Sequence, residues 1–242
     1  MAPSAAMHAA PTLARPPMPF PAAMARVLPF PSSRPEADPL DAIATTSVVD
    51  RDIAIFHQGG SADALFRLVD GVVRIHKLLP DGRRQIVGFL QAGDFFGLAF
   101  GDTYLYTAEA VTVATVRRMS RSRVDAVMDE HPALRQRLLV VTAEELIAAQ
   151  DQMLLLGRKN AVEKICSFLT MLSRRRARQG KDPARLHVPM SRADIADYLG
   201  LTIETVSRTI TKLKTAGTIR LLDGNKIALC DPETVASLAE GA

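Results

Sequence analysis

Short apolar runs separated by glycine-bearing turns dominate the chain between about residues 41 and 119. The runs are rich in β-branched and aromatic residues, and Asp-Gly pairs between them favour hairpin turns. The expected strands lie at residues 53–56, 65–69, 72–75, 86–90 and 111–116. Their close spacing predicts an antiparallel β-roll of the jelly-roll, or double-stranded β-helix, type.

The apolar period becomes helical after Arg121, and one long helix is expected from Pro132 to about residue 156, ending at Gly157. Apolar residues three and four positions apart form a seam on it, and a seam on so long a helix favours pairing with a second copy of the chain. The expected dimer contacts are Leu134, Leu138, Val141, Ala148, Asp151 and Leu155. Asp151 would weaken such a dimer if it were desolvated without a partner. Packing of the seam against the β-roll is the alternative.

Capping residues mark the starts of three further helices. Asn160, followed by Glu three residues later, begins a helix that ends in an arginine run before Gly180. Ser191 begins a short helix that ends at Gly200, and Thr202 begins another that ends at Gly217. Two short helices joined by a glycine turn, followed by a hairpin at residues 218–229, predict a winged helix-turn-helix.

The second of these short helices is expected to read DNA. Its apolar positions face inward, which leaves Glu204, Ser207 and Arg208 outward, with side chains suited to cytosine, thymine and guanine edges. The expected phosphate contacts are Ser191, Arg192, Thr202, Thr205, Thr211 and Lys212. The plainer interpretation is a solvated helix face with a Glu–Arg pair worth about 0.2–0.5 kcal/mol.

These elements predict an α+β protein with four segments. They are a flexible Ala/Pro-rich tail (1–40), the β-roll (41–130), a dimerisation helix (131–157) and the winged helix-turn-helix domain (158–242). Ten of the fifteen prolines lie in the first 39 residues, where they prevent regular structure. One sequence does not decide whether translation starts at Met1, Met18 or Met24.

Positive charge is concentrated in the C-terminal part. Residues 158–220 hold fourteen Lys and Arg against five Asp and Glu, a net charge of +9, whereas the whole chain carries +4. Such a concentration is typical of proteins that neutralise phosphates. No stretch is apolar enough to span a membrane, and neither paired carboxylates nor a nucleophile–base spacing indicates an enzyme. The two separated cysteines favour a cytoplasmic protein with reduced thiols. A further hypothesis is that oxidation of Cys166, on a helix beside the DNA-binding domain, disturbs DNA binding.

The order of roll, long helix and winged helix-turn-helix over about residues 48–229 resembles the CRP/FNR superfamily of bacterial regulators. Two stretches carry the resemblance, residues 150–160 (QDQMLLLGRKN) and residues 197–208 (DYLGLTIETVSR). Glu204, Ser207 and Arg208 match the E-x-x-S-R signature of the FNR and FixK branch. The cyclic-AMP receptor branch has arginine where Ile203 stands and glycine where Ser207 stands.

The resemblance implies a homodimer that binds a double-stranded TTGAT-N4-ATCAA-like palindrome and contacts RNA polymerase, usually as an activator of low-oxygen or nitrogen-fixation genes. No cysteine precedes Cys166, so the iron–sulfur cluster of FNR is not expected. Tyr106-Thr107 and Leu98-Ala99 stand where cyclic-nucleotide binders carry their phosphate contacts. No cofactor is therefore expected, and His57 and His76 are not expected to bind haem. A regulator gated by an unidentified small molecule in the roll is the alternative.

Overall fold

A computed structural model describes residues 38–99 and 101–241 of the chain. The expected tail lies outside the described residues up to residue 37, but its last three positions belong to the folded part. Asp38 caps the 3-10 helix η2 (Pro39–Ile43), whose Leu40 is fully buried. Asp38 also forms ion pairs with Arg67 and Arg137. The folded part therefore begins before residue 41, because an acidic cap and a buried leucine hold these positions.

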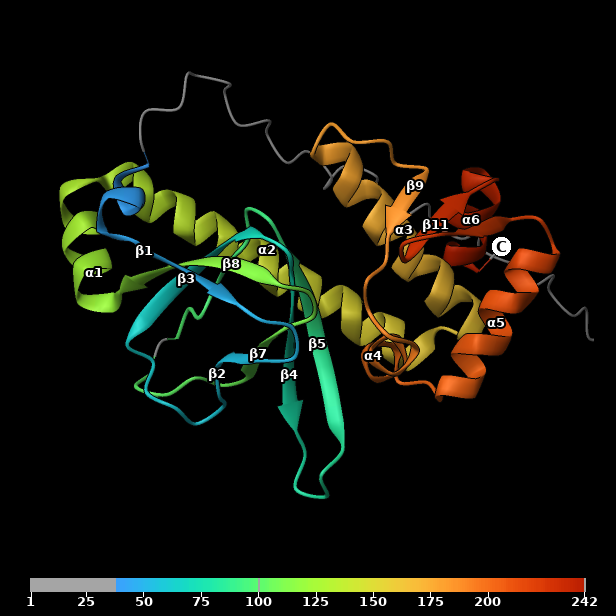
Figure 1. The fold of residues 1–242 in the computed structure, drawn as a ribbon, viewed down its shortest axis with the longest axis horizontal. Coiled ribbons are helices and arrows are strands. Elements are labelled where there is room, and N and C mark those ends of the chain that lie inside the picture. Colours follow the sequence, from blue (N-terminus) through green and yellow to red (C-terminus); the bar gives the residue numbers. More distant parts are fainter. Residues whose placement is uncertain (1–37, 100, 242) are drawn as a thin grey trace, which may run out of the picture. The chain divides into compact units, whose positions relative to one another are not determined.

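Two four-stranded antiparallel sheets build the predicted roll (Figure 1). One sheet has the order β1-β8-β3-β6 and the other the order β2-β7-β4-β5. The strands are β1 (Thr45–Val49), β2 (Ala54–Phe56), β3 (Ala64–Asp70), β4 (Val72–Leu78), β5 (Arg84–Gln91), β6 (Phe95–Phe96), β7 (Thr107–Ala110) and β8 (Ala114–Ser120). The α+β class and the roll are as the sequence predicted.

The expected strand at residues 111–116 is confirmed only for residues 114–116, which begin β8. Residues 111–113 form the turn between β7 and β8, which pair in different sheets. The Asp70-Gly71 pair is also not a hairpin turn, because β3 and β4 belong to different sheets. Gly71 is needed instead for a close approach, since a Cβ there would lie 2.5 Å from the Val113 carbonyl oxygen. The Asp81-Gly82 pair does form a hairpin turn, between β4 and β5.

Three helices follow the roll. Helix α1 (Arg121–Glu130) leads into α2 (Pro132–Arg158), which confirms the long helix, and α3 (Ala161–Arg178) follows after two residues. The Asn160 capping box at the start of α3 is formed as expected. None of the helices among the described residues has the length and apolar character needed to cross a bilayer.

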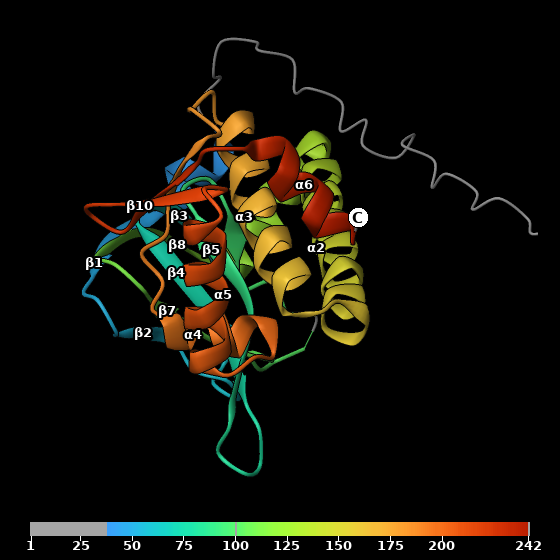
Figure 2. The same ribbon diagram turned by 90° about the vertical axis from the view of Figure 1, so that its right-hand side faces the viewer.

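The remaining elements form the winged helix-turn-helix. They are β9 (Arg185–His187), α4 (Arg192–Leu199), α5 (Ile203–Thr215), β10 (Ile219–Leu222), β11 (Lys226–Leu229) and α6 (Pro232–Glu240). The hairpin of β10 and β11 forms the wing, and β9 adds a third strand to it. Helix α6 contacts α3, as Figure 2 also shows. Strand β9 and helix α6 were not among the expected elements.

Candidate nucleic-acid interface

Local hydrogen bonds fix the turn between α4 and α5. The Ser191 hydroxyl accepts from the Asp194 backbone N–H (3.0 Å) and donates to the Asp194 carboxylate (2.8 Å). Gly200 ends α4 in the left-handed conformation, with φ 59°. The Thr202 hydroxyl then accepts from the Thr205 backbone N–H (3.2 Å) and begins α5. The short turn holds α5 at a defined angle to α4.

One face of α5 is buried in the domain and the other is open. Val206, Ile210 and Leu213 are buried in the core that also holds the inner face of α4. Glu204, Ser207 and Arg208 are exposed, at helix positions that place them on one stripe. The three side chains expected to read bases are therefore free to meet another molecule.

Helix α5 holds Glu204 in its charged form. A hydrogen bond from its own backbone N–H, and next the hydroxyl of Thr202, lower the pKa of the Glu204 carboxyl, to which Arg208 adds a smaller effect. A carboxylate accepts hydrogen bonds and donates none, which suits the amino group of cytosine. The guanidinium of Arg208, four residues on, is suited to two acceptors on guanine.

The expected phosphate contacts divide into two groups. Lys212 and Thr202 are exposed, and Thr205 is half-buried beside them. The Thr211 hydroxyl already donates to the Ser207 carbonyl oxygen (2.9 Å), and the Ser191 hydroxyl is used in the capping box. A phosphate oxygen needs a donor, so a phosphate contact through the hydroxyl of Ser191 conflicts with the structure.

Arg192 is half-buried, and desolvation lowers the pKa of its guanidinium. The exposed Arg220 and Lys226 of the wing were not among the expected contacts. Both residues lie on the hairpin that follows the helix expected to read DNA. This position in the sequence could have identified them as further phosphate contacts.

The expected dimer seam needs correction. Leu134 and Leu138 pack in the core of the protomer with Leu65 and Phe95, and Leu155 is buried in the core of the DNA-binding part. Val141 is half-buried, so only Ala148 and Asp151 of the expected set are exposed.

A second apolar stripe of α2 is the exposed one. Its large side chains repeat every seven residues: Leu139 and Val140, Leu146 and Ile147, Met153 and Leu154. A seven-residue repeat of this kind is typical of a helix that pairs with another helix. Both stripes have helical spacing, so the sequence pattern alone did not show which of them faces the protomer.

The hypothesis of a redox-active Cys166 conflicts with its surroundings. The thiol is fully buried, and desolvation raises its pKa to about 11. A thiolate is the reactive form, so a buried thiol with a raised pKa resists oxidation. Cys230, which follows β11, is the exposed cysteine.

The roll fills its own interior with aromatic side chains. Phe56 stacks on Tyr104 with the ring centroids 3.8 Å apart, and Phe66 and Phe96 continue the cluster. The hydroxyl of Tyr106 accepts from the Gly97 backbone N–H (3.2 Å). In the region where cyclic-nucleotide binders contact the phosphate, this side chain is therefore bonded to the protein's own backbone. His57 is exposed and His76 is buried elsewhere in the roll. Within residues 38–99 and 101–241, no group of His, Cys, Asp and Glu is arranged to hold a metal ion.

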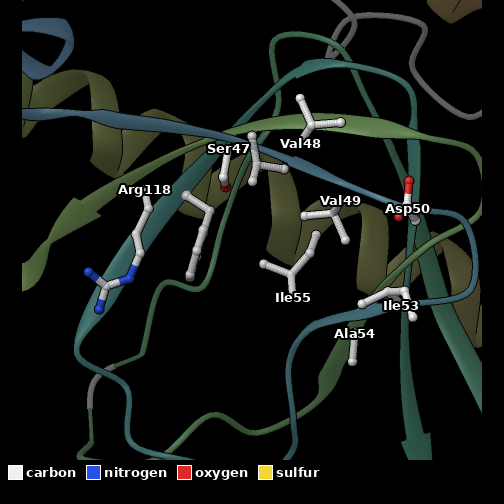
Figure 3. Close-up of a pocket in the computed structure, with 10 residues that line it drawn as sticks. Ser47, Val48, Val49, Asp50, Ile53, Ala54, Ile55 and Arg118 are labelled. Carbon is white, nitrogen blue, oxygen red and sulfur yellow. The ribbon is translucent and has the colours of Figure 1, made fainter.

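A groove of about 360 Å³ opens between β1 and β2 at one edge of the roll. Figure 3 shows the apolar side chains of Val49 and Ile55 inside it, with Asp50 and Arg118 on opposite sides. The groove is therefore mixed in character, and Phe66 of the aromatic cluster is one of the residues that line it.

Comparisons with known proteins agree with both halves of the architecture. A Crp-like helix-turn-helix domain matches residues 163–238, and a cyclic nucleotide-binding domain matches residues 47–131. The nitrogen fixation regulation protein FixK of Bradyrhizobium diazoefficiens is 42% identical over 185 residues, which cover 76% of this chain and 78% of FixK. The transcriptional activatory protein AadR of Rhodopseudomonas palustris is 43% identical over 187 residues, 77% of each chain.

A solved structure gives the same result. FixK2 from Bradyrhizobium japonicum superposes with a TM-score of 0.76 at 38% identity, covering 81% of this chain and 97% of the FixK2 chain.

Proposed function

Because the chain belongs to the CRP/FNR family of transcription regulators, we propose that it binds a TTGAT-N4-ATCAA-like palindrome as a homodimer through Glu204, Ser207 and Arg208. The chain is a helix-turn-helix DNA-binding regulator similar to the FixK and FnrL activators, and its relatives are regulators rather than enzymes. The single observation that carries the proposal is the exposed stripe of three side chains on the outer face of α5.

The homodimer forms through the exposed stripe of α2. Six large apolar side chains in a seven-residue repeat would cost about 1.5–3 kcal/mol each to leave in water rather than bury fully. A second copy of the same helix offers the matching repeat, and a two-fold dimer places the two α5 helices in successive major grooves about 34 Å apart.

The regulator binds its operator without a small-molecule effector and contacts RNA polymerase as an activator of low-oxygen or nitrogen-fixation genes. The aromatic side chains that fill the roll support the first statement. The similarity to FixK, a nitrogen fixation regulation protein, and to FnrL, a transcriptional activator protein, supports the role as an activator and the choice of nitrogen-fixation genes.

Selection of bound sequences from a random DNA pool, with purified protein and no additive, tests this function. We expect a palindrome of two TTGAT-like half-sites. Arg208→Ala should weaken binding to the selected operator by about 1–3 kcal/mol and relax the choice at one base pair. Lys212→Ala, also on α5, should weaken binding to all sequences alike and reduce the salt dependence. Equal operator binding by Arg208→Ala and the unmodified protein would refute the assignment.

The groove between β1 and β2 favours a second candidate, a regulator gated by a small molecule held there. This candidate predicts that purified protein binds the operator weakly and that cell extract restores binding. Tight binding by purified protein alone would count against it.

A further inference from the structure

The DNA-binding part and the roll share one core in the protomer. Phe89 of β5 lies 5.3 Å from the ring of Tyr198 on α4 and 6.2 Å from the ring of Phe168 on α3, measured between centroids. Arg175 of α3 donates to the Phe89 carbonyl oxygen (3.0 Å) and pairs with Asp94 beyond the end of β5. Strand β5 is thus the main surface of the roll that the helix-turn-helix touches.

Ion pairs at the edge of this core join the β4–β5 hairpin to α4. Arg84 of β5 donates to the Asp197 carboxylate (2.9 Å) and to the Asp194 carboxylate (2.8 Å). Arg74 of β4 lies 3.4 Å from Asp194, and the side chain of Gln85 donates to the Asp197 carbonyl oxygen (2.7 Å). The contacts bridge residues more than 100 positions apart in the chain.

One of these carboxylates also begins the helix. Asp194 is buried and accepts the Ser191 hydroxyl and backbone N–H while it faces the two arginines. Arg74 is itself held by Glu109 and Asp52 of the roll. The start of α4 is therefore tied to a cluster that is anchored in the sheet.

The covalent connection between the two parts is short, because only Lys159 and Asn160 separate α2 from α3. Helix α2 also holds α4 directly, since the side chain of Gln152 donates to the Tyr198 carbonyl oxygen (2.7 Å). Helix α4 contacts both β5 and α5, and Figure 1 shows it between them, with α5 on the side away from the sheet. Docking of α4 on β5 and on α2 thus fixes one orientation of α5 and leaves the outer face of α5 open.

We propose that Arg84 and Asp197 are positioning residues for operator binding, which fix α5 relative to the roll and so the separation of the two reading helices in the dimer. The inference rests on the proposed function. If the helix-turn-helix units of the dimer change orientation, only a fraction of the dimers is competent to bind the operator. The apparent affinity is then the intrinsic affinity multiplied by that competent fraction. Such a dimer also tolerates operators with altered half-site spacing.

A double-mutant cycle in the full-length protein tests this role. Arg84→Ala and Asp197→Ala should each weaken binding to the operator selected by the unmodified protein by about 10-fold, within the usual range for coupling between sites. The double variant should lose little more than either single variant, because all three lack the same contact. Arg84→Lys keeps the charge but not the two-pronged geometry, and should recover part of the affinity.

Arg117→Ala is the matched control. Arg117 pairs with Asp41 inside the roll (2.5 Å) at an exposure close to that of Arg84, and its removal changes the net charge by the same amount. The control should bind the operator as the unmodified protein does. Changing the spacing between the half-sites from the proposed four base pairs to three or five should weaken DNA binding. This loss of affinity should be smaller for Arg84→Ala than for the control.

Hydrogen exchange without DNA tests the positioning role of Arg84 and Asp197 separately from the proposed operator binding. Arg84→Ala should speed the exchange of α4 and β5 amides relative to Arg117→Ala, whatever the protein binds. Wild-type affinity and spacing preference in Arg84→Ala and Asp197→Ala, or additive losses in the double variant, would overturn the positioning role. Absence of any operator preference in the unmodified protein would instead overturn the proposed function.

Discussion

Gly200 offers a sharp test of how the turn between α4 and α5 is built. Its backbone adopts the left-handed conformation, with φ 59°, and its N–H bonds to the Ala196 carbonyl at the end of α4. Residues with a Cβ atom adopt this conformation at a cost of about 1–2 kcal/mol. We therefore expect Gly200→Ala to lower the free energy of unfolding by about that amount.

The surroundings of Gly200 add little to this cost. A Cβ there would lie 3.2 Å from the Cδ2 atom of Leu156, which is the far end of a flexible side chain and can move by a few tenths of an ångström. Gly157 is the matched control, because it lies inside α2 with open space around an added Cβ. Gly157→Ala should leave stability unchanged or raise it, by up to about 1 kcal/mol.

Urea unfolding of the full-length protein measures both changes. All variants are compared at one protein concentration, because the stability of a dimer depends on concentration. Gly200→Asn should cost less than Gly200→Ala, since asparagine tolerates the left-handed region better. Equal stability of Gly200→Ala and the unmodified protein, or equal shifts in Gly200→Ala and Gly157→Ala, would refute the reasoning.

The other predictions concern the cysteines and the dimer. With its pKa raised to about 11, Cys166 has about one thiolate in a thousand molecules at pH 8, so a thiol reagent should label the exposed Cys230 first and Cys166 on unfolding; fast labelling of Cys166 in folded protein would contradict this. Leu146→Asp should dissociate the dimer in sedimentation experiments and Asp151→Ala should tighten it; a dimer unchanged by Leu146→Asp would show that another surface pairs.

The helix-turn-helix could be predicted in detail because its signals are local. Ser191, Gly200 and Thr202 each act on backbone groups within a few residues, and the structure has all three in the expected caps. The inward stripe of α5 follows from helical spacing alone, which left the base-reading candidates exposed. For the same reason the Asp81-Gly82 hairpin was predicted correctly.

Signals that depend on distant partners failed. The run at residues 111–116 has strand composition, but only residues 114–116 lie in a strand, because the chain passes from one sheet to the other at residues 111–113, between β7 and β8. Asp70-Gly71 carries a hairpin signal, yet the chain changes sheets there and glycine serves a close contact with Val113.

The amino-acid sequence by itself determined helices α2 to α5, the caps of α3, α4 and α5, the exposed stripe on α5 and the concentration of positive charge in the C-terminal part. Each of these depends on residues within a turn or two of each other, or on composition. The tertiary structure decided which apolar stripe of α2 is buried against the protomer, and it brought Arg84 to Asp194 and Asp197 across more than 100 residues. Periodicity gives the face of a helix but not its partner, because the partner is set by how the whole chain packs.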